Sequence, residues 1–251
     1  MHKRTADLGV APLGPLLIKL SLPAIAGMLV MALYNVIDTF WVARLGGDAV
    51  AALTVVFPWQ IAVSALGVGA GVGVASLVAR RYGEGRGEEA NLAGGQVILL
   101  TVVLGFGLAV VAHLLPEPML RMFGATPEIM PLAKDYLFSV ALGVPFVMFM
   151  MGTNGLYRGA GNTMLPTIVM TTSAVCNAML APFMVLGLWG FPAMGVLGAG
   201  YSTAIAQLLG AAAALWHLRS HRSGFNIHWR HLRPSPQVLQ DIAAVGAPAG
   251  G

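Results

Sequence analysis

The sequence predicts an all-α membrane protein, built as a bundle of six transmembrane helices followed by the start of a seventh. Hydrophobic residues make up 57% of the 251-residue chain, and Asp, Glu, Lys and Arg together only 10%. A soluble domain usually carries about 25% charged residues. In addition, apolar stretches long enough to cross a bilayer recur along the whole chain. These observations exclude a soluble globular domain.

Six apolar stretches have the length of roughly 20 residues that a transmembrane helix needs. They cover residues 16–43, 49–79, 92–115, 136–157, 164–187 and 194–217. The first is too long for the apolar region of a signal peptide, so it is predicted to stay in the membrane. The second is long and contains Pro58, so it is predicted to tilt, to kink or to start in the interface. A seventh stretch begins near Gln237 and runs to Gly251.

Lys and Arg gather on one side of the predicted membrane. The N-terminus and the segments 80–91, 157–163 and 218–236 hold ten of them, and Lys19 lies close to this side, which makes eleven against three on the opposite side. The eleven are Lys3, Arg4, Lys19, Arg80, Arg81, Arg86, Arg158, Arg219, Arg222, Arg230 and Arg233. The positive-inside rule places this side in the cytoplasm, so we expect a multi-pass protein of the cell (inner) membrane with a cytoplasmic N-terminus. The basic residues are too dispersed to predict a nucleic-acid partner.

A short repeat predicts how the chain is organised. Pro23 and Pro248 each lie a few residues into an apolar stretch that starts on the cytoplasmic side. Transporters are often built from two such repeats. We therefore expect a cytoplasmic N-terminus (1–15), a six-helix lobe (16–217), a basic cytoplasmic inter-lobe loop (218–236) and the truncated start of a second lobe (237–251). The missing C-terminal lobe would then be a partner within the same chain. A half-size protein acting as a homodimer is the alternative.

Asp38 is the one acidic residue inside the six predicted spans. A charge at membrane depth costs on the order of 3 kcal/mol, so an intramembrane carboxylate is a functional hypothesis by default. Asn35 lies three residues earlier and shares its helix face. The functional interpretation is an ion- or proton-binding pair. The alternative is a buried carboxylate held by neighbouring hydroxyl or amide groups.

Four motifs carry a resemblance to a known family. They span Tyr34–Gly46, Val78–Arg86, Arg158–Thr163 and Gly195–Ala204. In this order and topology the chain resembles the N-terminal lobe of the multidrug and toxic compound extrusion (MATE) transporters. The resemblance implies one lobe of a twelve-helix transporter rather than an enzyme. It implies secondary active efflux of lipophilic, often cationic compounds in exchange for H⁺ or Na⁺, with no cofactor, in contact with membrane lipid.

The same resemblance implies roles for individual residues. Asp38, Asn177 and Thr203 would form the cation- or proton-coupling site. Pro23 would be a hinge, with a static kink as the alternative. Four further residues are expected to bind substrate or line the cavity: Tyr34, Asn35, Met151 and Asn154. The alternative is a structural role, in which the polar side chains join helices by hydrogen bonds and the methionine packs between helices or faces lipid.

One position departs from the family pattern. Relatives often have an aspartate four residues after the amide of helix five, where this chain has Ala181 after Asn177. A Na⁺ site at Asp38 would therefore have a single formal negative charge, which favours proton coupling. Asp38 has no second carboxylate at membrane depth within the six spans. This argues against an aspartyl protease, which needs two opposed carboxylates. A lipid-linked precursor flippase of the same superfamily is the alternative transport function, although only Lys19 is a candidate basic ligand within the spans.

Overall fold

The structure is a computed structural model that describes residues 36–220 and 224–250, together with residues 21, 22, 25, 26, 29 and 32. This part of the chain contains helices and no strand. Its α-helices are α3 (Gly47–Gly83), α4 (Gly87–Leu114), α5 (Pro116–Met122), α6 (Met130–Ala141), α7 (Val144–Gly159), α8 (Met164–Leu186), α9 (Val196–Arg219) and α10 (Pro236–Gly250). Residues 36–43 are also helical. The short 3₁₀ helices are η1 (Leu188–Gly190) and η2 (Trp229–Leu232).

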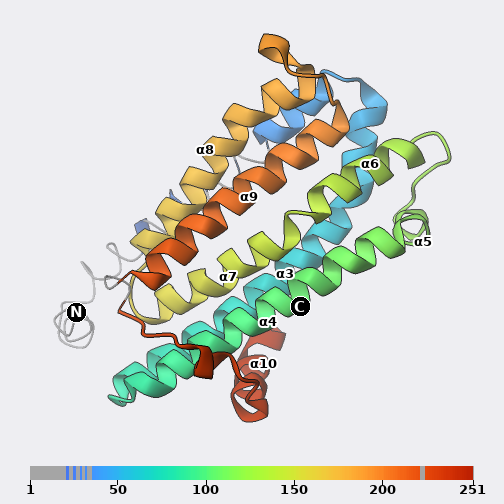
Figure 1. Ribbon diagram of the computed structural model, residues 1–251. Coiled ribbons are helices and arrows are strands. Elements are labelled where there is room, and N and C mark those ends of the chain that lie inside the picture. Colours follow the sequence, from blue (N-terminus) through green and yellow to red (C-terminus); the bar gives the residue numbers. More distant parts are fainter. Residues whose placement is uncertain are drawn as a thin grey trace.

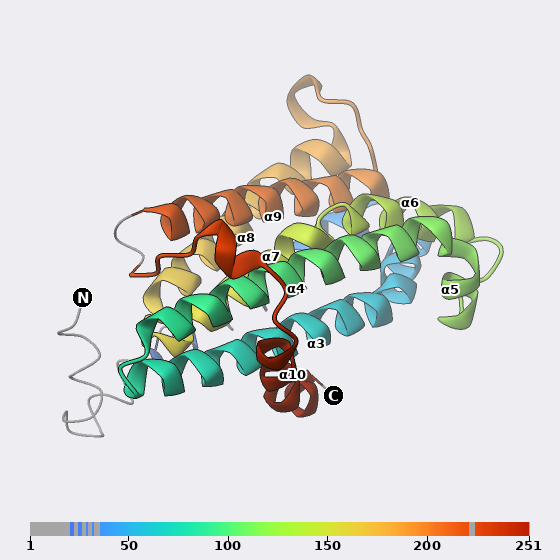
Figure 2. The same ribbon diagram turned by 60° about the horizontal axis from the view of Figure 1, so that its bottom comes forward.

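The long helices form an elongated bundle. Helices α8 and α9 lie side by side, and α7 lies beside both α3 and α4 (Figure 1). Helix α10 packs against α3, and the segment that leads to it crosses α4 (Figure 2). Helix α3 has 37 residues, roughly 55 Å at 1.5 Å per residue. It is therefore much longer than the hydrocarbon core of about 30 Å.

Four helices in the described part are long and apolar enough to cross a membrane, namely α3, α4, α8 and α9. They coincide with the second, third, fifth and sixth predicted spans. The first predicted span lies largely outside the described residues. Pro58 lies inside α3, which continues past it as a single helix. Helix α10 begins at Pro236, where the seventh apolar stretch was expected.

The predicted apolar span over residues 136–157 is not a single straight helix. The chain forms α6 and α7, two helices bent by 47° at a break of a few residues. Pro145 contributes to the break, because it has no N–H to donate to the carbonyl of Ala141 and its ring crowds that carbonyl. Helix α6 accordingly ends at Ala141 and α7 restarts at Val144. Together they still pass as one broken span.

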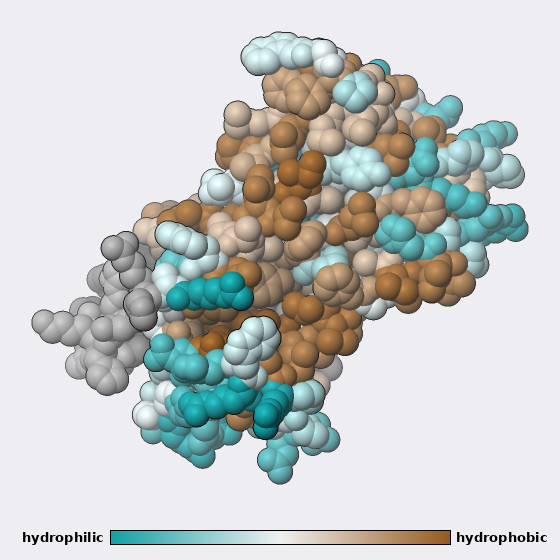
Figure 3. Space-filling model, viewed as in Figure 1, coloured by the Kyte–Doolittle hydropathy of each residue, from teal (hydrophilic) through white to brown (hydrophobic). Residues whose placement is uncertain are grey.

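Small residues set the distance between helices. A methyl group on Gly155 of α7 would touch the carbonyl oxygen of Gly71 on α3 and lie 2.6 Å from its carbonyl carbon. Such close backbone contacts are typical of membrane helices, which have no hydrophobic driving force between them and associate through packing. The outer surface is apolar over the middle of the face in Figure 3 and hydrophilic toward both ends.

We predict that Gly155→Ala destabilises the bundle, because the added methyl group meets backbone that no rotamer change can move. Overpacking of this kind costs about 1–3 kcal/mol of unfolding free energy. Gly107→Ala is the matched control, since a methyl group there meets nothing within 4 Å. Thermal unfolding in detergent, followed by tryptophan fluorescence, should show a lower Tm for Gly155→Ala alone. Equal Tm values would contradict the close packing of α3 on α7.

Candidate functional site

Asp38 lies in the helical segment 36–43 with only 7% of its surface exposed. Its Oδ1 is buried and has no hydrogen-bond partner among the residues that the structure describes. Val42, one turn later on the same face, belongs to a buried cluster that includes Val185 of α8 and Val196 of α9. The face that carries Asp38 therefore borders a buried cluster to which α3, α6, α8 and α9 all contribute.

Asn177 and Thr203 meet in the interface between α8 and α9. The Asn177 Nδ2 donates to Thr203 Oγ1 at 3.0 Å and to Ser202 Oγ at 3.4 Å, and Asn177 is completely buried. Ser202 in turn donates to the carbonyl oxygen of Ala199 at 2.8 Å. The Asn177 Oδ1 has no partner in the described part of the chain. The structure thus brings together two of the three predicted coupling residues and adds Ser202 to them.

Ala181 occupies a buried position between this polar group and the apolar cluster. It lies one turn after Asn177 and one turn before Val185 on α8, and it has no exposed surface. Its methyl group therefore adds no charge to the interior. Asp38 Oδ1 and Asn177 Oδ1 remain as buried acceptors. Leaving a buried acceptor unpaired costs about 1–3 kcal/mol, so a proton or a cation bound here would relieve this cost.

Gln207 extends the polar face of α9 by one turn beyond Thr203. Its Oε1 is buried without a partner among the described residues. A methyl group on Gly143, at the break between α6 and α7, would touch this oxygen. Sequence reasoning missed Gln207, and its spacing of four residues from Thr203 was the available signal. The polar face of α9 therefore reaches the one broken span in the described part of the chain.

Asn154 lies in a different place, at a small cavity among α7, α8 and α9. The cavity, of about 10 Å³, is lined by Met150, Thr153, Asn154, Tyr157, Leu165, Pro166, Val169, Met170 and Ala214. Its volume suits about one water molecule. The Asn154 Nδ2 donates to Met170 Sδ at 3.3 Å, while Oδ1 has no partner within the described residues. The lining contains neither Asp38 nor Asn177.

The remaining predicted site residues divide into two groups. Met151 faces α3, where its side chain packs against the Cα position of Gly67. Pro23, Tyr34 and Asn35 lie outside the described residues. Within the described part of the chain, no three His, Cys, Asp or Glu side chains are close enough to hold a metal ion together. A second polar pair, which the sequence did not suggest, joins Tyr157 Oη to His217 Nδ1 at 2.9 Å.

Comparison with known proteins agrees with this architecture. The MatE family model matches residues 23–183, more than half of the chain. The chain is 31% identical to a FAD transporter of Shewanella oneidensis, covering 94% of this chain and 53% of that protein. It is 29% identical to a probable multidrug resistance protein NorM of Pseudomonas putida, covering 94% and 51%.

Solved structures give the same result. The bundle superposes on the outward-facing conformation of a multidrug resistance MATE family transporter with a TM-score of 0.86 and 30% identity. The match covers 94% of this chain and 51% of the solved one. The chain therefore spans about half the length of the relatives it matches. Fold, motifs and family model agree, and the chain belongs to the MATE family of multi-pass membrane transporters.

Proposed function

We propose that this chain supplies one lobe of a secondary transporter that exports lipophilic, often cationic compounds in exchange for H⁺ or Na⁺. The observation that carries the proposal is Asp38, a nearly buried carboxylate with a buried oxygen that has no partner among the described residues. In this proposal the protein lies in the cell (inner) membrane with a cytoplasmic N-terminus. A second lobe completes the cavity, and Pro23 is a candidate hinge.

The proposed coupling step is a change of charge at Asp38. Binding of H⁺ or Na⁺ would neutralise the carboxylate, which removes the cost of a charge at membrane depth and the attraction for a cationic substrate. Asn177 Oδ1 offers a further acceptor oxygen, and the hydroxyl of Thr203 lies against the same amide. Substrate and coupling ion would then compete for the same charge, which is the thermodynamic basis of exchange.

The buried methyl group of Ala181 favours H⁺ as the coupling ion. Na⁺ is a hard cation and prefers several oxygen ligands with anionic charge among them. With Ala181 fully buried, the described residues around Asn177 contribute no second carboxylate. A single carboxylate is sufficient to carry a proton.

We predict that Asp38→Asn reduces export to the level of cells that lack the protein, because an amide can neither take up a proton nor balance a cation. Ethidium efflux from cells that express the complete protein measures this. Asp48→Asn is the matched control, since Asp48 is exposed in the first turn of α3, and it should export normally. Export by Asp38→Asn at the rate of this control would refute the role of Asp38.

We predict that Ala181→Asp makes export respond to sodium. The added carboxylate would lie one turn from Asn177 and would supply the second anionic ligand that Na⁺ needs. Proteoliposomes with separately imposed proton and sodium gradients measure the response, which should rise several-fold for the sodium gradient. Ala181→Asn, of equal size but uncharged, is the control. A sodium response that is the same in both variants would contradict the proposed reason for proton coupling.

A second candidate function is export of a flavin nucleotide, which the similarity to the FAD transporter of Shewanella oneidensis favours. A flavin nucleotide is anionic at its phosphates, so it would not be held by Asp38 in the way a cation would. Uptake of FAD and of ethidium into inverted vesicles separates the two functions. We expect ethidium uptake that excess FAD does not inhibit. Uptake of FAD alone would assign the flavin function instead.

A further inference from the structure

The connection between α9 and α10, defined here as residues 224–235, is bound to the bundle along its length. Phe225 is buried, with its ring centroid 5.8 Å from those of Tyr82 of α3 and Tyr157 of α7. The hydroxyl of Tyr82 also donates to the carbonyl oxygen of Gly224 at 3.4 Å. An aromatic side chain packed between two helices fixes the start of the connection to α3 and α7.

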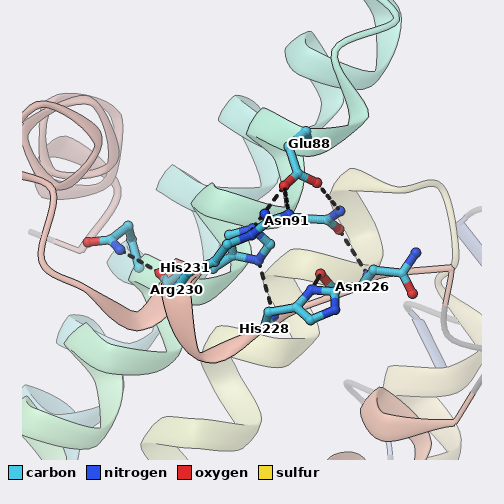
Figure 4. Close-up of polar contacts among 7 residues, drawn as sticks. Glu88, Asn91, Asn226, His228, Arg230 and His231 are labelled. Atoms are coloured by element: carbon cyan, nitrogen blue, oxygen red, sulfur yellow. Dashed lines mark hydrogen bonds and ion pairs between the residues drawn. The ribbon is translucent and has the colours of Figure 1, made fainter.

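A polar network holds the middle of the connection on α4 (Figure 4). Glu88 Oε1 accepts from Arg230 Nη2 and lies 3.1 Å from His231 Nε2. The other oxygen of Glu88 accepts from Asn91 Nδ2 at 3.4 Å, and Asn91 Oδ1 accepts from the backbone N–H of Asn226 at 3.1 Å. His231 is buried, and its Nδ1 accepts from the backbone N–H of His228 at 3.1 Å. The polar groups of α4 and those of the connection therefore supply each other's hydrogen-bond partners.

Gln96 of α4 binds the end of the connection through both the nitrogen and the oxygen of its side-chain amide. Its Nε2 donates to the carbonyl oxygens of His231 and Arg233, each at 2.7 Å, and its Oε1 accepts from the backbone N–H of Ser235 at 2.8 Å. Gln96 is completely buried. Displacing the connection would break all three of these hydrogen bonds at once, each worth about 1 kcal/mol net. Ser235 directly precedes α10, so Gln96 also fixes where α10 begins.

Glycines allow backbone to lie against backbone at the same place. A methyl group on Gly95 of α4 would lie 2.7 Å from the carbonyl carbon of His231. On α3, a methyl group at Gly73 would touch the carbonyl oxygen of Ile242 on α10. Gly246 of α10 faces the carbonyl oxygen of Gly69 in the same way. The close contact therefore runs from the connection through the first three turns of α10.

We propose that Gln96 and Glu88 are positioning residues that keep residues 224–246 in one rigid body with α3–α9 throughout the transport cycle. Motion relative to any following lobe then takes place beyond this contact. Pro248 lies just after it, inside α10, where the missing N–H frees the carbonyl of Ala244 and weakens the helix. The pivot is thus beyond Gly246, at Pro248, rather than in the polar connection. The proposal uses the proposed function only for its kinetic readout.

The rigid-body claim is tested by a distance measurement on the complete protein. Spin labels would be placed at Trp229 of η2 and Met179 of α8, which are both exposed, after Cys176→Ala and replacement of any further cysteine of the complete protein. In lipid nanodiscs, we expect one distance distribution that is unchanged by pH, by sodium and by ethidium. A distribution that shifts with any of these conditions would overturn the proposal, because the connection would then move relative to the bundle.

The role of Gln96 is tested by a matched pair of substitutions. Gln96→Met keeps the length of the side chain and removes three hydrogen bonds, whereas Gln240→Met makes the same change at an exposed position of α10. Each net hydrogen bond is worth a factor of about five in population. Amide exchange over residues 226–240 should therefore be about a hundredfold faster in Gln96→Met than in Gln240→Met. Equal exchange would overturn the proposal.

Transport kinetics distinguish a role of Gln96 in positioning the connection from a role in binding the exported compound. In Gln96→Met we expect a several-fold lower maximal rate of ethidium export with an unchanged KM. If Gln96→Met does not fold, Glu88→Gln tests the same attachment of the connection to α4 through its contacts with Arg230 and His231. Amide exchange over residues 226–240 should then be faster in Glu88→Gln than in Gln240→Met. Normal exchange in Glu88→Gln would then overturn the proposal. Absence of any export with a narrow, unchanging distance distribution would refute the proposed function and leave the rigid body standing.

Discussion

The bilayer core contains no water to pair with backbone or side-chain polar groups, and this constraint shapes every part of the structure. Helices satisfy their own backbone, and several hydroxyl side chains donate within their own helix as well. Thr101 donates to the carbonyl oxygen of Val97, Thr153 to that of Phe149, and Ser139 to that of Asp135. Against this background, four buried side-chain oxygens have no partner in the described part of the chain, those of Asp38, Asn154, Asn177 and Gln207. The chemistry that we assign to the protein is located at two of them, on Asp38 and Asn177.

The four long spans could be predicted from the sequence because a run of apolar residues is a local property. The break between α6 and α7 could not be found by average hydropathy, since residues 136–157 are apolar on both sides of it. Pro145 and Gly143 were the local signals, but Pro58 shows that a proline alone does not end a helix in this chain. At the break itself, Gly143 lies against Gln207 of α9, a contact that the local sequence does not encode.

The candidate site could be predicted only in part. Asp38 stands out because of its charge, and the resemblance selected Asn177 and Thr203, which do form a hydrogen bond. Gln207 and Ser202 were missed because neither is charged and each is common in packed helices. The contacts of Gln96 reach residues 135 to 139 positions away. No local pattern encodes such pairing, so the docking of the connection required the three-dimensional structure.

The pairing of Gln96 also has a consequence for how the protein is made. Helix α4 enters the membrane well before the ribosome has synthesised His231 and Ser235, which lie 135 and 139 residues later. At a synthesis rate of about 5–20 residues per second, this delay is on the order of ten seconds. During that interval the amide of Gln96 and the carboxylate of Glu88 lack the partners they have in the finished fold. The nascent helix therefore needs to keep this end at the membrane surface, in contact with water, until the connection arrives to cover it.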